Sequence, residues 1–159
     1  MKSETHNNLL TVYTIGHGRH SFADFLALLQ KYRIEFLCDV RSAARSRWVQ
    51  FNGAVLSEEL RLNNIGYEHL PECGGKTIAA PEDLNRGIER VLELAADLRT
   101  VIMCSESQPL TKHKIPKANC HRVGLLAPRL KQRGASRIIH ILPDGGEIEF
   151  DEAAVASVW

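Results

Sequence analysis

The sequence predicts an α/β fold: a single three-layer domain with a mostly parallel central sheet and helices on both faces. Short β-branched runs alternate with longer stretches of helical periodicity, and strands separated by helices are typical of a parallel sheet. The run at 100–104 is almost continuously apolar, as expected of a strand covered on both faces. We therefore expect residues 11–159 to form one α/β domain, after a disordered or loosely ordered segment at residues 1–10.

The first strand and helix have clear boundary residues. Residues 11–15 form a β-branched and aromatic run that ends at Gly16, which predicts a strand. Ser21 is placed as the N-cap of a helix, with Asp24 three positions later, and the apolar periodicity continues to about Tyr32. The chain thus begins with a strand–helix unit.

A second strand–helix unit follows, with a basic connection inside it. Residues 35–40 predict a strand, and residues 41–52 form an irregular, arginine-rich stretch. Residues 54–63 predict a helix, which ends before the glycine at position 66. Residues 67–70 then form a short extended segment.

The second half of the chain repeats this alternation. Pro81 fits the first turn of a helix, where its missing N–H is not needed. Asn119 is placed as the N-cap of a later helix, which Gly134 ends. The predicted elements are a helix at 81–98, a strand at 100–104, a polar loop at 105–118, a helix at 120–133, and strands at 137–142 and 147–150.

Composition excludes several classes of protein. The length of 159 residues suits one domain with its own core, and the net charge of +1 argues against a protein that coats nucleic acid. No apolar run approaches the ~20 residues that span a bilayer, so we expect no membrane partner. The polar start lacks a secretory signal, and 4 cysteines are too few for a disulfide framework, which favours a reducing cytoplasm. Composition makes no prediction about oligomeric state.

Polar and titratable residues follow several of the predicted strands. Parallel sheets bind ligands at the carboxyl ends of their strands, so these residues are expected at one edge. The segments that meet there are Gly16-His17, Asp39-Val40-Arg41 with Arg45 and Arg47, Cys104-Ser105-Glu106, and Cys120-His121-Arg122 at a helix start.

The arginines at this edge predict an anion site. Guanidinium groups suit phosphate or carboxylate, and the amides of a helix that begins at Cys120 would add partial positive charge. No acidic residue lies between Arg41 and Arg47 to pair these side chains locally. The alternative is that they only solvate a loop. The predicted anion-binding residues are Arg41, Arg45, Arg47, His121 and Arg122.

Two cysteines at this edge allow three interpretations. Cys120, at a helix start near an arginine, is a candidate nucleophile or redox thiol, and Cys104 is either a second reactive thiol or a small buried residue. Cys104, Glu106, Cys120 and His121 would together offer zinc ligands, but their spacing matches no standard motif. We expect no metal and no cofactor. A Cys-x5-Arg phosphate loop is also absent, as are the Walker, Rossmann and Gly-x-Ser-x-Gly motifs.

The remaining candidates are acids, bases and supporting residues. His17 lies in a glycine-flanked turn and is a candidate general base, although a loop histidine is often only a surface residue. Glu106 is a candidate acid or base, and Asp39 either shares that role or holds the arginines in place. Tyr67 and His69, before the Gly74-Gly75 loop, are expected to support the edge.

With these residues assembled, the chain resembles the family called domain of unknown function 488. The resemblance covers about Tyr13 to Ile141 and implies a compact α/β domain with its signature residues at one edge. It implies no established activity. The matching segments are Tyr13-Thr14-Ile15-Gly16-His17, Cys38-Asp39-Val40-Arg41, Arg45-Ser46-Arg47 leading to Phe51-Asn52, Gly66-Tyr67-Glu68-His69-Leu70-Pro71 with Gly74-Gly75, Cys104-Ser105-Glu106, and Cys120-His121-Arg122.

The chain departs from the family pattern at three places. Gly18 stands where the family commonly has serine, and Ala43-Ala44 stand where a proline is frequent. The loop before Cys120 is longer than expected, and its extra residues include Lys112, His113, Lys114 and Lys117. This basic segment at 112–117 either widens specificity toward a polyanion or acts as a surface lid.

The sequence therefore favours an enzyme that acts on a phosphate-bearing small molecule or a nucleic-acid substrate. A hydrolase or transferase with Cys, His and Glu chemistry would use His17, Cys104, Glu106 and Cys120. Two alternatives stay open: a non-catalytic module that binds nucleotide or nucleic acid, and a metal-stabilised domain without turnover.

Overall fold

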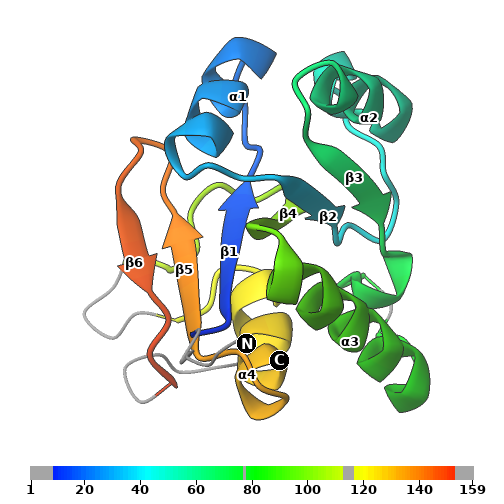
Figure 1. Cartoon of the computed structure of the whole chain (residues 1–159), viewed down its shortest axis with the longest axis vertical. Coiled ribbons are helices and arrows are strands. Elements are labelled where there is room, and N and C mark those ends of the chain that lie inside the picture. The colour runs from blue at the N-terminus through cyan, green and yellow to red at the C-terminus, as the bar shows by residue number, and fades with distance from the viewer. Residues whose placement is uncertain (1–8, 77, 113–116, 153–159) are drawn as a thin grey trace, which may run out of the picture.

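A computed structural model describes residues 9–76, 78–112 and 117–152 of the chain. These residues form a six-stranded sheet with the strand order β3-β2-β4-β1-β5-β6. Strands β1 to β5 run parallel, and β6 runs antiparallel to β5 (Figure 1). The predicted α/β domain with a mostly parallel sheet is confirmed.

The first half of the chain follows the predicted boundaries closely. Ser21 caps the first helix, since its side-chain oxygen accepts a hydrogen bond from the Asp24 amide at 3.1 Å. The elements are β1 (Thr11–Gly16), α1 (Phe22–Lys31), β2 (Phe36–Asp39), the 3-10 turn η1 (Val49–Phe51), α2 (Gly53–Arg61), β3 (Gly66–His69) and the 3-10 turn η2 (Pro71–Cys73).

The second half agrees except at one helix. Its elements are α3 (Pro81–Asp97), β4 (Thr100–Cys104), the π-helix η3 (Arg122–Leu126), α4 (Ala127–Gln132), β5 (Arg137–Ile141) and β6 (Glu147–Glu149). No helix among the described residues is long and apolar enough to cross a membrane. The predicted loose segment lies mostly at residues 1–8, and part of the extra basic loop lies at 113–116; both fall outside the described residues.

The helix predicted at 120–133 is present, but its first part is π-helical, and the prediction that Asn119 caps it is wrong. The Asn119 side chain donates to the Gln108 carbonyl, and the chain enters a π-helical turn whose five residues are all buried. Pro128, in the first turn of α4, has no N–H to donate four residues back, which favours the wider turn before it. The helix start therefore presents no exposed row of amides to an anion.

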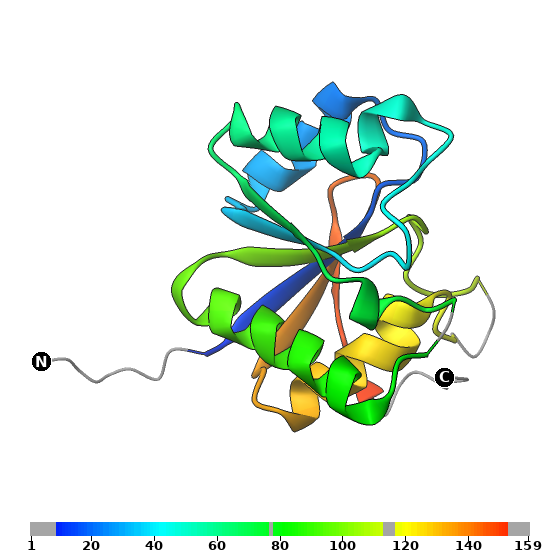
Figure 2. The same cartoon turned by 90° about the vertical axis from the view of Figure 1, so that its right-hand side faces the viewer.

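Two apolar layers hold the helices against the sheet. Helices α1 and α2 pack on one face with Phe25, Leu56 and Met103 in the core between them. Helices α3 and α4, with η3, pack on the other face around Ile88 and Leu130. Figure 2 shows α1 and α2 above the sheet and α3 and α4 below it.

The carboxyl ends of the central strands meet at one edge, as predicted. Strand β4 lies inside the sheet between β2 and β1, and its last residue, Cys104, is in register with Gly16. The Val40 amide donates to the Met103 carbonyl at 3.0 Å, which brings the end of β2 to the same place. In Figure 2 the loops that follow β2 and β4 lie together on the right.

Gly16 allows the loop after β4 to cross the end of β1. A Cβ atom at this position would lie 1.7 Å from the Glu106 carbonyl oxygen, so only glycine fits. The pairing of β1 and β4 continues past the strand ends, because the His17 amide donates to Cys104 and the Gly18 amide donates to Ser105. Gly16 thus fixes where residues after Cys104 lie.

We predict that Gly16→Ala destabilises the protein by at least about 1–3 kcal/mol, because backbone must move to admit the methyl group. Urea unfolding followed by circular dichroism measures the change. Gly146→Ala is the matched control, since a Cβ there meets only side-chain ends, at 3.2 Å and beyond. Equal stability of the two variants would contradict the close approach at Gly16.

Candidate functional site

The polar edge of the sheet is hollowed around Ser105. Within the described residues, four neighbouring hollows share this serine in their lining. One of about 540 Å³ is bordered by Arg45 and Lys76, and one of about 270 Å³ reaches Cys104. The hollows together form a cleft, here called the Ser105 cleft, over the ends of β1, β2 and β4.

A completely buried guanidinium lies beneath the cleft. Arg122 has no exposed surface, and its Nε donates to the Cys104 sulfur at 3.1 Å. Its two Nη groups donate to the Thr14 hydroxyl at 2.5 Å and to the Glu106 carbonyl at 2.9 Å. In the described part of the chain Arg122 forms no ion pair with a carboxylate. A buried charge without a counter-charge is costly, so Cys104 is the group that can neutralise it as a thiolate.

The two thiols at this edge contact each other. The sulfur atoms of Cys104 and Cys120 lie 3.5 Å apart, and both side chains are buried. Burial alone would raise the pKa of Cys104, but the hydrogen bond from Cys120 and the charge of Arg122 outweigh it and lower that pKa. The same hydrogen bond, together with burial, raises the pKa of Cys120. Cys104 is therefore the thiolate and Cys120 its hydrogen-bond donor. The sequence had pointed to Cys120 as the activated thiol.

A neutral relay supports Arg122 from the sheet. The Thr14 hydroxyl that accepts from Arg122 lies 2.7 Å from His140 Nδ1 on the neighbouring strand β5. Burial, with a smaller effect of Arg122, lowers the pKa of His140 to about 3, so this imidazole is neutral. The sequence analysis assigned no role in the site to Thr14 or His140. The available signal was a polar side chain inside an otherwise apolar strand.

The second arginine at the edge is paired differently. Arg41 donates from Nε and Nη2 to the two carboxylate oxygens of Asp39 at 2.8 and 2.7 Å, and both residues are buried. The Tyr67 hydroxyl also donates to Asp39, at 2.5 Å, and burial followed by this contact raises the pKa of Tyr67. His69 Nε2 donates to the Arg41 carbonyl at 2.8 Å. Asp39, Tyr67 and His69 thus hold Arg41 at the cleft wall.

His17 presents a buried nitrogen that has no partner among the described residues. Its Nδ1 lies 2.9 Å from the Gly18 carbonyl, which can only accept, so Nδ1 carries the proton and Nε2 has the free lone pair. Burial is the main cause that lowers the pKa of His17, and the ring stacks on Phe51 at 4.3 Å between centroids. His17 is a neutral acceptor beside the cleft.

Several cations around the cleft have no carboxylate partner in the described residues. Elsewhere on the surface several arginines pair with carboxylates, for example Arg61 with Glu58 and Arg137 with Glu149. The exposed guanidinium of Arg47 lies 5.7 Å from the ring of its neighbour Trp48. Unpaired positive charge of this kind suits an anionic ligand. The cations are Arg19, Arg45, Arg47 and Lys76.

The residues weighed as zinc ligands are used in other ways. His121 Nε2 donates to the Val40 carbonyl at 2.8 Å, and the Glu106 carboxylate accepts from the Gln108 amide at 2.9 Å. Among the described residues, no group of three or more His, Cys, Asp or Glu side chains is arranged to hold a metal ion. Glu106 remains exposed at the mouth of the hollow that reaches Cys104.

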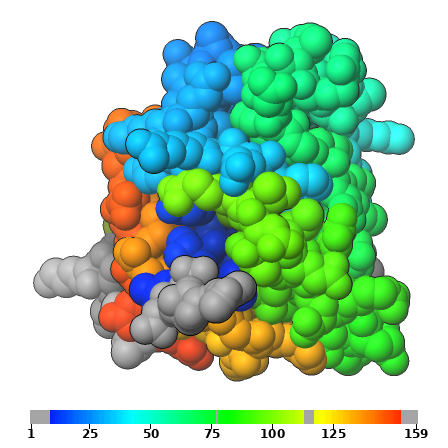
Figure 3. All heavy atoms as spheres, in the orientation of Figure 1, coloured from blue at the N-terminus to red at the C-terminus, as the bar shows by residue number. Residues whose placement is uncertain are grey.

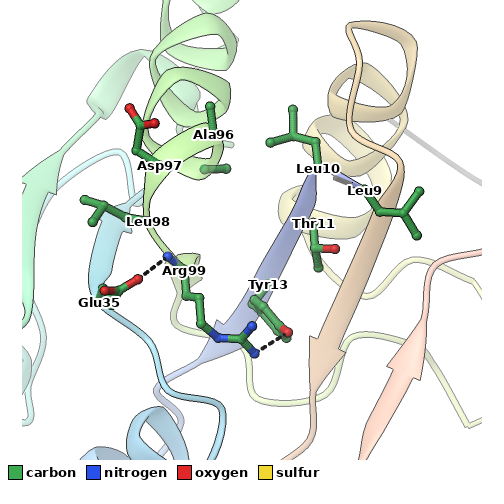
Figure 4. Close-up of a pocket in the computed structure, with 10 residues that line it drawn as sticks. Leu9, Leu10, Thr11, Tyr13, Glu35, Ala96, Asp97, Leu98 and Arg99 are labelled. Atoms are coloured by element: carbon green, nitrogen blue, oxygen red, sulfur yellow. Dashed lines mark hydrogen bonds between the residues drawn. The ribbon is translucent and has the colours of Figure 1, made fainter. Parts of the chain in front are cut away.

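A separate hollow of about 380 Å³ lies at the opposite, amino-terminal end of the strands. Figure 3 faces this end of the molecule, where atoms of β1 are visible beside those of the α3–β4 connection. Two of its polar side chains are held by Arg99, whose guanidinium donates to the Tyr13 hydroxyl at 2.6 Å and whose backbone amide donates to the Glu35 carboxylate at 2.8 Å (Figure 4).

The structure thus brings the predicted site residues to one edge but divides their roles. Arg122 and Arg41, predicted to hold an external anion, bind Cys104 and Asp39 of the protein itself. Arg45 and Arg47 stay free, and Gly16 acts by letting the backbone of Glu106 approach. Arg19, which follows the first strand, lies at this edge as that position predicts, whereas the sequence did not single out Lys76, which only the folded chain brings to the cleft.

The family called Domain of unknown function DUF488 matches residues 21–83 of the chain. The chain therefore resembles this family from α1 to the start of α3, a part that holds Asp39, Arg41, Tyr67 and His69. The match does not reach His17, Cys104 or Arg122. Neither a curated protein nor a solved structure matches the chain.

The lowered pKa of Cys104 predicts selective alkylation. Iodoacetamide should modify Cys104 at neutral pH, with a midpoint well below the usual thiol value of about 8.5, because the thiolate is the reactive form. Cys38 and Cys73 serve as internal controls, since burial raises the pKa of both, that of Cys73 to about 12.

Peptide mass spectrometry across a pH series reads this out. Cys120→Ala should move the Cys104 midpoint upward, because the donor to the thiolate is lost. A midpoint for Cys104 at or above about 8.5 would contradict the assignment.

Proposed function

We propose that the protein is a cysteine-dependent hydrolase or transferase that acts on a phosphate-bearing small molecule or nucleic-acid end. Cys104 is the nucleophile, and the unpaired cations of the Ser105 cleft bind the phosphate of the substrate. The resemblance to DUF488 brings no activity of its own, so the proposal rests on the site.

The observation that carries the proposal is the Arg122–Cys104 contact at the floor of the cleft. A fully buried guanidinium 3.1 Å from a sulfur keeps that sulfur anionic and therefore nucleophilic. The sulfur borders a hollow of about 270 Å³, which gives a reacting group access to it. A cysteine with only a structural role would need neither the adjacent Arg122 guanidinium nor a hollow beside its sulfur.

The cations give the substrate its orientation. Arg45 and Lys76 border the hollow that contains Cys120, and Arg45 also borders the one next to His17. A phosphate held there would carry the rest of the substrate over Ser105 toward Cys104. Guanidinium and ammonium donors to phosphate form charge-assisted hydrogen bonds, which are the strong class of such contacts.

Two groups around the cleft can move protons. The Glu106 carboxyl borders the Cys104 hollow. When the Cys104 thiolate attacks the electrophilic atom of the substrate, the bond from that atom to the leaving group breaks, and a protonated Glu106 would give its proton to that leaving group. His17, with a neutral Nε2 lone pair, is the candidate base for the water or acceptor that then releases the group from Cys104. Cys120 and Arg122, which contact the Cys104 sulfur, position it for attack and stabilise the thiolate that the second step releases.

One observation favours a second candidate, a non-catalytic module that binds a nucleotide or a nucleic acid. Trp48 is 37% exposed beside Arg47, at a hollow of about 350 Å³ that also includes Arg19 and His17. An exposed aromatic ring among arginines suits stacking on a base with phosphate contacts nearby. This candidate predicts binding that survives the loss of Cys104.

For binding, we expect Arg45→Ala and Lys76→Ala each to weaken phosphate-ligand affinity by about tenfold or more, since each removes a charge-assisted contact. Calorimetry with inorganic phosphate, nucleoside monophosphates and a 5′-phosphorylated oligonucleotide measures the change at two salt concentrations. Arg61→Ala, which removes an exposed arginine paired with Glu58, is the matched control. Unchanged affinity in the two cleft variants would reject the anion site.

For activity, a panel of phosphate esters and phosphorylated oligonucleotides should contain a substrate whose turnover falls by about a thousandfold or more in Cys104→Ser. Intact-mass analysis should detect a covalent adduct on Cys104 during turnover. Cys73→Ala, at a buried cysteine away from the cleft, should keep the activity. Turnover that persists in Cys104→Ser would exclude Cys104 as nucleophile, and tight binding without turnover would favour the binding module.

A further inference from the structure

We propose that Cys104 and Cys120 form a redox pair: a hydroperoxide oxidises Cys104, and Cys120 then closes a reversible disulfide with it. The inference uses the thiols of the proposed active site but requires no substrate of that site. It gives Cys120 a second role, as a reacting thiol, besides that of a hydrogen-bond donor to Cys104.

The geometry of the two thiols suits this chemistry. Their sulfur atoms already lie 3.5 Å apart, whereas a disulfide requires about 2.05 Å. Cys104 ends a central strand, and Cys120 lies in the turn before η3, outside the sheet. To form the disulfide, the two sulfur atoms must come closer by roughly 1.5 Å. The turn that holds Cys120 can make this movement while the register of the strands stays unchanged.

Arg122 prepares the sulfur that reacts first. Its Nε–H lies 3.1 Å from Cys104 and, with Cys120, keeps the pKa of that thiol low. Thiolate character makes a cysteine susceptible to oxidation. Cys120 has the opposite property, because its pKa is raised and it holds a proton. The pair thus contains one reactive thiolate and one protonated thiol that resolves it.

The reaction balances in two steps. The Cys104 thiolate attacks one oxygen of the hydroperoxide, an S–O bond forms, the O–O bond breaks, and hydroxide or alkoxide leaves. The sulfur of Cys120 then attacks Cys104-SOH, the S–S bond forms, and the S–O bond breaks as hydroxide leaves. The proton of Cys120 neutralises one released anion, and the proton that the solvent took up when Cys104 ionised returns to neutralise the other. Both thiols are oxidised, and the peroxide is reduced to water or to water and an alcohol.

Access and selectivity follow from the cleft. The hollow of about 270 Å³ is lined by both cysteines and exceeds the roughly 30 Å³ that a water molecule occupies, so a small hydroperoxide fits. Cys38 and Cys73 are buried, and burial raises the pKa of each. The other two cysteines of the chain are thus a built-in control for nonspecific oxidation.

The test is peptide mapping of the whole wild-type chain after treatment with hydrogen peroxide, without a reducing agent. We expect a Cys104–Cys120 disulfide that dithiothreitol removes, while Cys38 and Cys73 react at least about tenfold more slowly. Cys120→Ser should stop at the sulfenate of Cys104, which dimedone traps. Cys104→Ser should leave Cys120 reduced.

A Cys104 that stays reduced, one that proceeds to sulfinate in the wild type without the disulfide, or a disulfide that joins other cysteines would overturn the proposal. No substrate enters the assay, so failure here leaves the anion site and turnover to their own experiments. The wild-type map decides the outcome even where a variant folds poorly.

Discussion

The structure depends on how the buried guanidinium of Arg122 is accommodated. This one side chain joins four parts of the chain: β1 through Thr14, β4 through Cys104, the following loop through Glu106, and η3, to which it belongs. A guanidinium removed from water requires both hydrogen-bond acceptors and a counter-charge. Its acceptors are two carbonyls, a hydroxyl and a sulfur. The counter-charge therefore falls to Cys104, and the reactivity that we propose for this thiol would follow from a requirement of the fold.

The two buried arginines of this edge illustrate two solutions to the same problem. Arg41 is neutralised by the carboxylate of Asp39, which also accepts a hydrogen bond from Tyr67. Both charges of this pair are therefore satisfied within the protein, and the pair shapes the cleft wall. Arg122 is neutralised by a sulfur that borders a hollow, so the same electrostatic need places the proposed nucleophile at the cleft. The exposed cations beyond them have no carboxylate partner in the described part of the chain, whereas Glu58, Glu89 and Glu149 pair with other arginines. In this account, different arginines shape the cleft wall, stabilise the Cys104 thiolate and bind the proposed anion.

Local signals in the sequence predicted most of the fold. The apolar run that became β4 and the Ser21 cap each depend on neighbouring residues, so the elements and their common edge were predictable. After α2 the positive φ falls at Asn64, and Gly66 begins β3. The roles within the site were not. Arg122 meets Thr14, which is 108 positions away, and Thr14 meets His140 across 126 positions, contacts that no local pattern encodes. The π-helical turn also misled prediction, because the sequence before Pro128 has ordinary helical periodicity.

The pH dependence of stability tests the Cys104–Arg122 pairing most directly. Unfolding free energies from urea titrations should be compared for the wild type and Cys104→Ser. The unfolded thiol keeps its proton up to about pH 8.5, whereas the folded thiolate, with its lowered pKa, has released it. The unfolded state then binds the extra proton, so wild-type stability should rise toward about pH 8.5 by up to ~1.4 kcal/mol per pH unit, and this gain should vanish as the pH falls through the folded pKa. Parallel curves for the two proteins would mean that Cys104 is a neutral thiol and would contradict the pairing.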